Sequence, residues 1–192
     1  MPHLIVLAGP NGAGKSTAAP ALIRDLLGIR HFVNADTIAR GLSGYDPESV
    51  SLAAGRIMLA RLRELAARRE DFAFETTLAS RSFAPWIAGL REQGYVFHLR
   101  YLWIPSPELS VVRIEGRVRD GGHHVPGDIV RRRYLGGLAN FFRLYRPIAD
   151  DWEMFDNSDQ PRRLIAHGRR LEDEWVYDRE TWDLVRSTAE DG

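Results

Sequence analysis

Short apolar runs alternate with longer amphipathic stretches along most of the chain. Four of the runs have the length of buried strands and lie at residues 4–8, 31–35, 71–74 and 95–104. Three intervening stretches repeat apolar residues at helical spacing, at residues 18–27, 47–69 and 82–93. Strands that alternate with helices in this way are typical of a mostly parallel sheet with helices on both faces. The pattern therefore predicts an α/β domain with a three-layer fold.

The second half of the chain continues with longer helices and weaker strands. Two proline signals begin helices, one from Pro107 to about Arg119 and one from Pro126 to about Arg146. The run at residues 152–155 predicts an edge strand, and residues 163–167 predict a last short strand. We therefore expect one domain at residues 1–170, built on a sheet of about five strands.

The C-terminal tail, residues 171–192, has a different composition. It holds eight acidic residues against two arginines. Trp175 and Trp182 are seven residues apart, so on a helix they would share one face. We expect an acidic helical tail whose tryptophans dock on this chain or on a partner.

Composition and charge narrow the classes of protein. The 192 residues are enough for one domain with a full core, and the 26 basic residues balance the 26 acidic ones. That balance argues against a nucleic-acid partner or an anionic membrane surface. No apolar run reaches about 18 residues, and the chain enters its first strand without a signal peptide. With no cysteine, disulfides and thiolate metal sites are excluded, and we expect a cytoplasmic protein.

One stretch carries most of the candidate chemistry and lies between the first strand and the first helix. Its Gly-x4-Gly-Lys-Ser spacing fits the phosphate-binding loop, in which glycines turn successive backbone N–H groups inward. Lys15, the chain's single lysine, would reach the β- and γ-phosphates of ATP, and the Ser16 hydroxyl would ligate Mg²⁺. The predicted nucleotide-binding residues of this loop are Gly9, Asn11, Gly12, Ala13, Gly14, Lys15, Ser16 and Thr17.

Two acids follow predicted strands, at the sheet edge where ligands of open α/β sheets bind. Asp36 follows the second strand and is a candidate base or metal-side carboxylate, although it could instead cap the helix that begins at Thr37. Glu75 follows the third strand, and Thr77 lies two residues further on. Glu75 could hold Mg²⁺ through water, bind an acceptor substrate, or only hydrogen-bond nearby backbone.

An arginine-rich segment at residues 113–133 is predicted to form a helical lid. Glycines and two histidines, His123 and His124, separate its two helices. The segment holds three acids against six arginines, which are Arg113, Arg117, Arg119, Arg131, Arg132 and Arg133. Arginines on a hinged hairpin can close on a transferring phosphoryl group and exclude water, although a solvated basic face would have the same composition. No third ligand with metal spacing accompanies the histidines, which argues against a zinc site.

These separated motifs together resemble the zeta-toxin group of P-loop kinases, over about residues 3–165. In that family the acid after the second strand is the base that activates a sugar hydroxyl, which implies this role for Asp36. The family's Glu-x-Thr after the third strand contacts the sugar nucleotide and matches Glu75 and Thr77. Its Pro-Glu-Leu-Ser helix recurs at residues 107–110, and its lid arginine ten residues after that proline falls on Arg117.

Two parts of the family pattern differ in this chain. A further glutamate on the helix before the Glu-x-Thr strand has no counterpart, because residues 55–59 hold no acid. The second lid arginine has no direct match, and His123 or one of Arg131 to Arg133 could take its place. Asn157, in the turn after the strand at residues 152–155, lies where a nucleotide base could pack, although a turn asparagine needs no such role. Arg117, His123, Arg133 and Asn157 complete the predicted nucleotide contacts.

The resemblance implies a P-loop fold with strand order 2-3-1-4-5 and ATP and Mg²⁺ as cofactors. It implies transfer of the γ-phosphoryl group to a hydroxyl of a small molecule, with a UDP-sugar among the candidate acceptors and an antitoxin as a protein partner. Catalysis would depend on Asp36, Lys15 and Arg117. The alternatives are a nucleotide-binding interaction protein without turnover and a polynucleotide kinase. A transporter-type ATPase fits poorly, because Leu42-Ser43-Gly44-Tyr45 is too early and incomplete for its signature.

Overall fold

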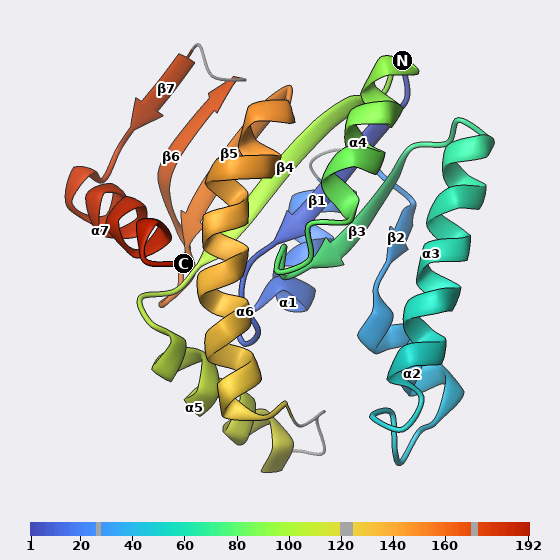
Figure 1. Cartoon of the computed structure of the whole chain (residues 1–192), viewed down its shortest axis with the longest axis horizontal. Coiled ribbons are helices and arrows are strands. Elements are labelled where there is room, and N and C mark those ends of the chain that lie inside the picture. The colour runs from blue at the N-terminus through green and yellow to red at the C-terminus, as the bar shows by residue number, and fades with distance from the viewer. Residues whose placement is uncertain (26–27, 120–124, 170–172) are drawn as a thin grey trace.

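The computed structural model describes residues 1–25, 28–119, 125–169 and 173–192, and these residues form an α/β domain around one sheet (Figure 1). The sheet has seven strands in the order β2-β3-β1-β4-β5-β6-β7. Their bounds are β1 His3–Ala8, β2 His31–Val33, β3 Phe72–Thr76, β4 Val96–Trp103, β5 Asp151–Asp156, β6 Arg163–Arg169 and β7 Asp173–Val176. Strands β1 to β5 are parallel, while β6 and β7 pair antiparallel.

The predicted fold class and the order 2-3-1-4-5 are therefore confirmed, but the expected size of the sheet is wrong. Strand β5 is not an edge strand, because β6 pairs with it on the side away from β4. Strand β5 alternates buried and half-buried residues, and the half-buried Asp151 and Glu153 pair with Arg100 of β4. An interior strand with one partly open face has the same alternation as an edge strand, so the pattern does not distinguish them.

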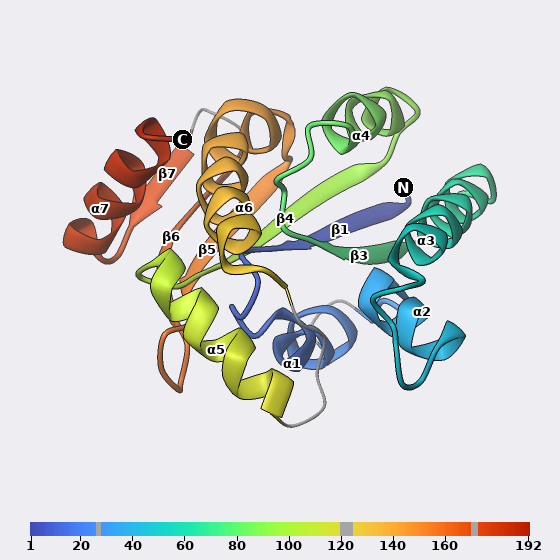
Figure 2. The same ribbon diagram turned by 60° about the horizontal axis from the view of Figure 1, so that its bottom comes forward.

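Helices cover the two faces of the sheet unequally (Figures 1 and 2). Four of them pack on one face: α3 Ser51–Ala67, α4 Phe83–Glu92, α6 Gly127–Asn140 and α7 Arg179–Glu190. The other face is covered over β1 and β3 by α1 Lys15–Ala19, which continues as the π-helical turn η1 Pro20–Asp25. Successive residues of β1 point to opposite faces, so Val6 belongs to the hydrophobic core on the first face and Leu7 to the core on the second.

Two further helices lie at the carboxyl end of the parallel strands, where Figure 2 shows them on either side of α1. These are α2 Ala35–Leu42 and α5 Pro107–Arg119. Helix α6 leaves this end of the sheet and continues as η2 Phe141–Tyr145 and η3 Arg146–Ile148. The carboxyl end of a parallel sheet is where α/β proteins bind ligands, so these helices frame the candidate site.

Helix boundaries differ from the sequence expectations in two places. Helix α3 begins at Ser51 because the predicted first turn is a separate turn, in which the Ser49 backbone N–H donates to Asp46 Oδ1 (3.3 Å). The first helix begins at Lys15, earlier than residue 18, and residues 26–27 at its expected end lie outside the described part of the chain.

The C-terminal tail is not helical throughout, so the expectation that its two tryptophans share a helical face is wrong. Trp175 lies on β7 and stacks on His167 of β6, with ring centroids 4.8 Å apart. Trp182 lies on α7, fully buried, and stacks on Trp152 of β5 at 5.6 Å. The Arg146 guanidinium packs 4.7 Å from the Trp152 ring and pairs with Glu174 (2.6 Å). The tail therefore extends the sheet and covers its α6 face.

Across the described ranges, no helix is both long and apolar enough to span a membrane.

Candidate active site

The phosphate loop, residues 9–17, connects β1 to α1 in a conformation that requires glycine. Gly12 and Gly14 have φ angles of 76° and 75°, in the left-handed region that glycine adopts without strain. Gly9 has φ 140°, and a Cβ atom on it would lie 2.2 Å from the Leu102 carbonyl oxygen. The close approach of β4 to the loop therefore excludes any larger residue at position 9.

Four polar side chains meet at the C-terminal end of the loop. The Lys15 ammonium is buried (6% exposed), donates to the Pro10 carbonyl (2.8 Å) and lies 3.6 Å from Glu75 Oε1. Glu75 Oε2 accepts from the Ser16 hydroxyl (2.9 Å) and from the Asn34 amide (2.7 Å). The side chains of four residues therefore lie close together. The loop provides the Lys15 ammonium and the Ser16 hydroxyl, the residue after β2 provides the Asn34 amide, and β3 provides the Glu75 carboxylate.

Asn34 has two roles in the structure that the sequence reasoning missed. Strand β2 ends at Val33 rather than residue 35, and Asn34 is the N-cap of α2. Its Oδ1 atom accepts from the backbone N–H groups of Asp36 (2.7 Å) and Thr37 (3.1 Å), while its amide reaches Glu75. The cap proposed as an alternative for Asp36 therefore belongs to Asn34. An asparagine just before a helix is a known capping signal, so the sequence could have indicated this role.

Asp36 lies in the first turn of α2 with its side chain exposed toward the loop. It contributes to a cavity of about 160 Å³, which we call the phosphate cavity. The cavity is lined by Asn11, Gly12, Gly14, Lys15, Ser16, Thr17, Asp36, Glu75 and Arg113. The structure thus brings most of the predicted loop residues together with both strand-end acids.

Arg113 lines this cavity, although the sequence predicted it only as one of several lid arginines and not as a residue that supports the loop. Its guanidinium donates to the carbonyl oxygens of Gly12 (3.3 Å) and Asn157 (3.1 Å) and to that of Ser158. Asn157 in turn donates from Nδ2 to the Ala13 carbonyl (2.7 Å). Both side chains thus hold the outer side of the phosphate loop to the turn after β5. The sequence signal for Arg113 is its position one helical turn before Arg117.

Thr77 lies outside the residues that line the phosphate cavity. It belongs to the turn after β3, where its Oγ1 accepts from the Ala79 backbone N–H (3.4 Å) and Leu78 has a φ of 57°. Helix α6 holds this turn in place, because the Asn140 amide donates to the Leu78 carbonyl (2.8 Å). A Cβ atom at Gly137 would lie 2.2 Å from the Thr77 carbonyl oxygen, so α6 packs directly on the turn.

The predicted lid residues are placed only in part. Arg117 lies on α5, but its side chain is outside the described part of the structure, and His123 lies wholly outside it. Arg133 lies on α6 with its side chain half-buried. The two helices of the predicted lid are therefore present as α5 and α6, and the contacts of Arg117 and His123 stay predictions.

The fold and the loop define a P-loop kinase-like α/β domain. The chain belongs to the AAA domain family, whose model matches residues 4–141. An uncharacterized protein of Haemophilus influenzae is 32% identical over 130 residues, which cover 68% of this chain and 91% of that protein.

Solved structures with the same fold include a toxin–antitoxin system. The AvrRxo1-ORF1:-ORF2 structure with ATP matches 98% of this chain with a TM-score of 0.78 and 16% identity. This chain spans only 64% of the length of that AvrRxo1 chain. The PezAT chromosomal toxin–antitoxin system of Streptococcus pneumoniae matches 100% of this chain and 87% of its own, with a TM-score of 0.63 and 16% identity. A putative kinase of Chloroflexus aurantiacus matches 69% of this chain and 80% of its own, with a TM-score of 0.54 and 18% identity. At these identities the likeness establishes the fold.

Proposed function

We propose that the protein is an ATP-dependent kinase of zeta-toxin type that phosphorylates a hydroxyl of a small molecule, a sugar nucleotide or a related metabolite. The proposal depends on one observation: Glu75 contacts both Lys15 and Ser16 inside a cavity that Asp36 also lines. A lysine and a loop of backbone amides bind phosphates, and a carboxylate near the same point can accept the proton of an attacking hydroxyl.

The donor set next to Lys15 fits Mg²⁺. The Ser16 hydroxyl and the Glu75 carboxylate lie 2.9 Å apart, and both are hard oxygen donors of the kind that Mg²⁺ prefers. Ser16 would ligate the ion directly, and Glu75 would hold it through water. A bound Mg²⁺ would neutralise charge on the phosphates. The contacts of Glu75 with Lys15 and Ser16 support this role for Glu75 rather than contact with the acceptor.

The chain's own residues divide the remaining work. Lys15 and the loop amides hold the β- and γ-phosphates, and Asp36 accepts the proton of the acceptor hydroxyl. The acceptor oxygen then bonds to the γ-phosphorus, the bond from that phosphorus to the bridging oxygen breaks, and ADP leaves with the bridging oxygen. Arg117 and a second lid group, His123 or Arg133, stabilise the negative charge during transfer. Asn157 and Arg113 keep the loop in position from its outer side.

An antitoxin partner is part of the same proposal. One solved structure with this fold comes from the PezAT toxin–antitoxin system, and another is described as AvrRxo1-ORF1:-ORF2 with ATP. A protein bound over the phosphate cavity would block the nucleotide. Such a partner would reduce ATP binding when added to this chain.

The test is transfer of labelled γ-phosphate from Mg·ATP to a panel of sugar nucleotides, free sugars, nucleosides and short oligonucleotides. We expect label on one small-molecule class, lost in Lys15→Ala and in Asp36→Asn. Asp36→Asn should keep ATP binding, because the carboxylate acts on the acceptor. Full transfer by Asp36→Asn would show that the base is wrongly assigned, and label only on oligonucleotides would favour a polynucleotide kinase. ATP binding with no label on any acceptor would favour an interaction protein without turnover.

A further inference from the structure

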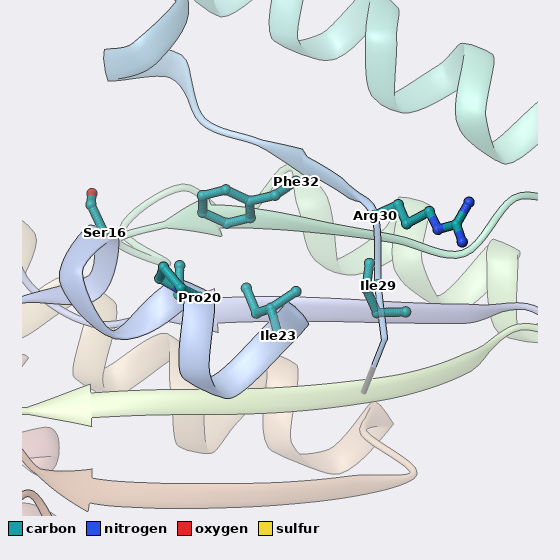
Figure 3. Close-up of a pocket in the computed structure, with 7 residues that line it drawn as sticks. Ser16, Pro20, Ile23, Ile29, Arg30 and Phe32 are labelled. Carbon is teal, nitrogen blue, oxygen red and sulfur yellow. The ribbon is translucent and has the colours of Figure 1, made fainter. Parts of the chain in front are cut away.

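A groove with apolar walls runs beside the phosphate cavity, on the face of the sheet that carries α1 (Figure 3). It has a volume of about 420 Å³, within the range of small-molecule sites. We call it the α1–β2 groove, and it is lined by Ser16, Ala19, Pro20, Ile23, Ile29, Arg30 and Phe32. None of the predicted functional residues except Ser16 belongs to it.

The walls of the groove come from two elements. Successive turns of α1 and η1 provide Ser16, Pro20 and Ile23, which lie on one side of the helix because their spacing is three or four residues. The opposite wall is Ile29, Arg30 and Phe32, on the segment that leads into and forms β2. Ile23 and Ile29 are nearly fully buried and form the apolar floor of the groove.

The exposed side chain of Phe32 indicates that no side chain of the described residues fills this groove. Strand β2 is the edge of the sheet, and α1 with η1 packs over β1 and β3 without covering it. Phe32 is therefore 37% exposed, and in Figure 3 its ring lies above Pro20 and Ile23. A ligand packed between this ring and the helix would remove apolar surface from water on both walls.

The two ends of the groove are polar, and they differ in charge. Ser16 is at one end and also lines the phosphate cavity, so the two hollows meet at this residue. Arg30 is at the other end, exposed, and no described carboxylate is within ion-pair distance of its guanidinium. Ser16 lies 3.4 Å from Asn34, four residues after Arg30. Four residues of extended chain span roughly 13 Å, so the backbone of Arg30 lies roughly that far from Ser16.

We propose that the α1–β2 groove binds the body of the phosphate acceptor, and that the acceptor is an apolar alcohol with one anionic group at its far end. This inference rests on the proposed kinase function and replaces the sugar nucleotide, among the candidate acceptors, with an apolar one. The reacting hydroxyl would lie near Ser16 and Asp36, the apolar body would pack between Phe32 and Ile23, and a carboxylate or phosphate would bind Arg30. A guanidinium suits either anion, because its planar fork donates two parallel hydrogen bonds.

The class of acceptor follows from the walls of the groove. A polar molecule such as a sugar nucleotide would leave hydroxyl and amide groups unpaired against Ile23, Ile29 and Phe32, which disfavours it there. An uncharged alcohol would fill the apolar part and gain nothing from Arg30. An acceptor with both features uses the whole length of the groove.

The binding test uses anilinonaphthalene sulfonate, a fluorescent probe with an apolar body and one anion. It is titrated into the full chain, with and without Mg²⁺ and a non-hydrolysable ATP analogue. We expect one bound probe, with its dissociation constant raised about tenfold or more in Phe32→Glu and about fivefold in Arg30→Gln. The controls are Leu184→Glu and Arg179→Gln on α7, both at exposed positions. Unchanged affinity in both groove variants, or equal loss in the controls, would overturn the proposal. Arg30→Gln keeps the test valid should Phe32→Glu fail to fold.

The transfer test separates this inference from the kinase function. Labelled γ-phosphate transfer is compared for hydroxyhexanoate against hexanediol, and for hydroxymethylbenzoate against benzenedimethanol, with hexanediol monophosphate as the phosphate arm. We expect the anionic member of each pair to be preferred by fivefold or more, and that preference to be lost in Arg30→Gln. Transfer to a sugar nucleotide that Phe32→Glu and Arg30→Gln leave unchanged would overturn the groove proposal and keep the kinase. A probe bound in the groove, with ATP bound and no label on any of these alcohols or on the sugar nucleotides, would overturn both the kinase and an acceptor role for the groove.

Discussion

Replacing Glu75 with glutamine should strengthen metal-free ATP binding. The Glu75 carboxylate lies 3.6 Å from the Lys15 ammonium, the one lysine in the chain. A phosphate group that binds Lys15 must compete with this carboxylate and lie close to its negative charge. Glu75→Gln removes the charge and keeps an oxygen that can accept from Ser16 and Asn34. The geometry of the cluster should therefore survive the substitution.

The size of the effect follows from the separation of the charges. Two unit charges 3.6 Å apart attract by about 1 kcal/mol in bulk water and by about 5 kcal/mol at an effective dielectric constant of about 20. Lys15 is buried and Glu75 is partly exposed, so the pair lies between these limits. We expect metal-free ATP to bind about 1–3 kcal/mol more tightly, which is about 5- to 150-fold.

The assay is titration of a fluorescent ATP analogue in EDTA and in Mg²⁺. In EDTA, Glu75→Gln should bind more tightly than the wild type. In Mg²⁺ the further gain should be smaller than in the wild type, because the carboxylate proposed to hold the hydrated ion is gone. The control is Glu153→Gln, a carboxylate that pairs with the buried Arg100 at 2.8 Å and is not part of the phosphate cavity. Equal or weaker metal-free binding by Glu75→Gln would refute the reasoning.

Two further predictions concern stability. Trp182→Ala removes a fully buried ring stacked on Trp152, which should lower the free energy of unfolding by about 3–5 kcal/mol and the melting temperature by roughly 10 °C. Trp175 is 47% exposed, so Trp175→Ala should lower the free energy of unfolding by under about 1 kcal/mol. Equal losses of stability in the two variants would contradict the docking of α7. Burial raises the pKa of Asp151, but the hydrogen bond from His98 and the charge of Arg100 outweigh burial and lower the pKa to about 2. Because the folded pKa is depressed, this carboxylate stabilises the fold above about pH 4 and loses the effect as pH falls toward about 2. In urea unfolding Asp151→Asn should cost about 1–2 kcal/mol at neutral pH and little near pH 2, with Asp183→Asn as control.

Local patterns in the sequence predicted most of the elements and the phosphate loop. The spacing of glycines, Lys15 and Ser16 is a local signature, because the loop binds phosphates with its own backbone and adjacent side chains. Helix α5 begins at Pro107 as expected, and Gly94 follows α4 with a φ of 91°, as a residue that ends a helix should. The buried face of α6, with Val130, Tyr134 and Leu138, also agrees with its helical periodicity.

Contacts between distant residues were beyond such patterns. Arg113 reaches Gly12 across 101 residues, and Asn157 reaches Ala13 across 144 residues. Neither separation leaves a periodic signal, so the support of the loop from its outer side became visible only in the folded chain. The same holds for Asn34, whose amide meets Glu75 across 41 residues because β2 and β3 are neighbours in the sheet.

The sequence by itself therefore determined the class of fold, the order of its elements and the chemistry of the phosphate loop, since each depends on residues close together in the chain. The tertiary structure decided which strands are interior, because pairing of β6 with β5 and β7 depends on partners rather than on the strand's own pattern. It also decided that Trp182 is core while Trp175 is surface, and that an apolar groove lies open beside Ser16. Burial is a property of what packs against a residue, and only the fold brings those neighbours together.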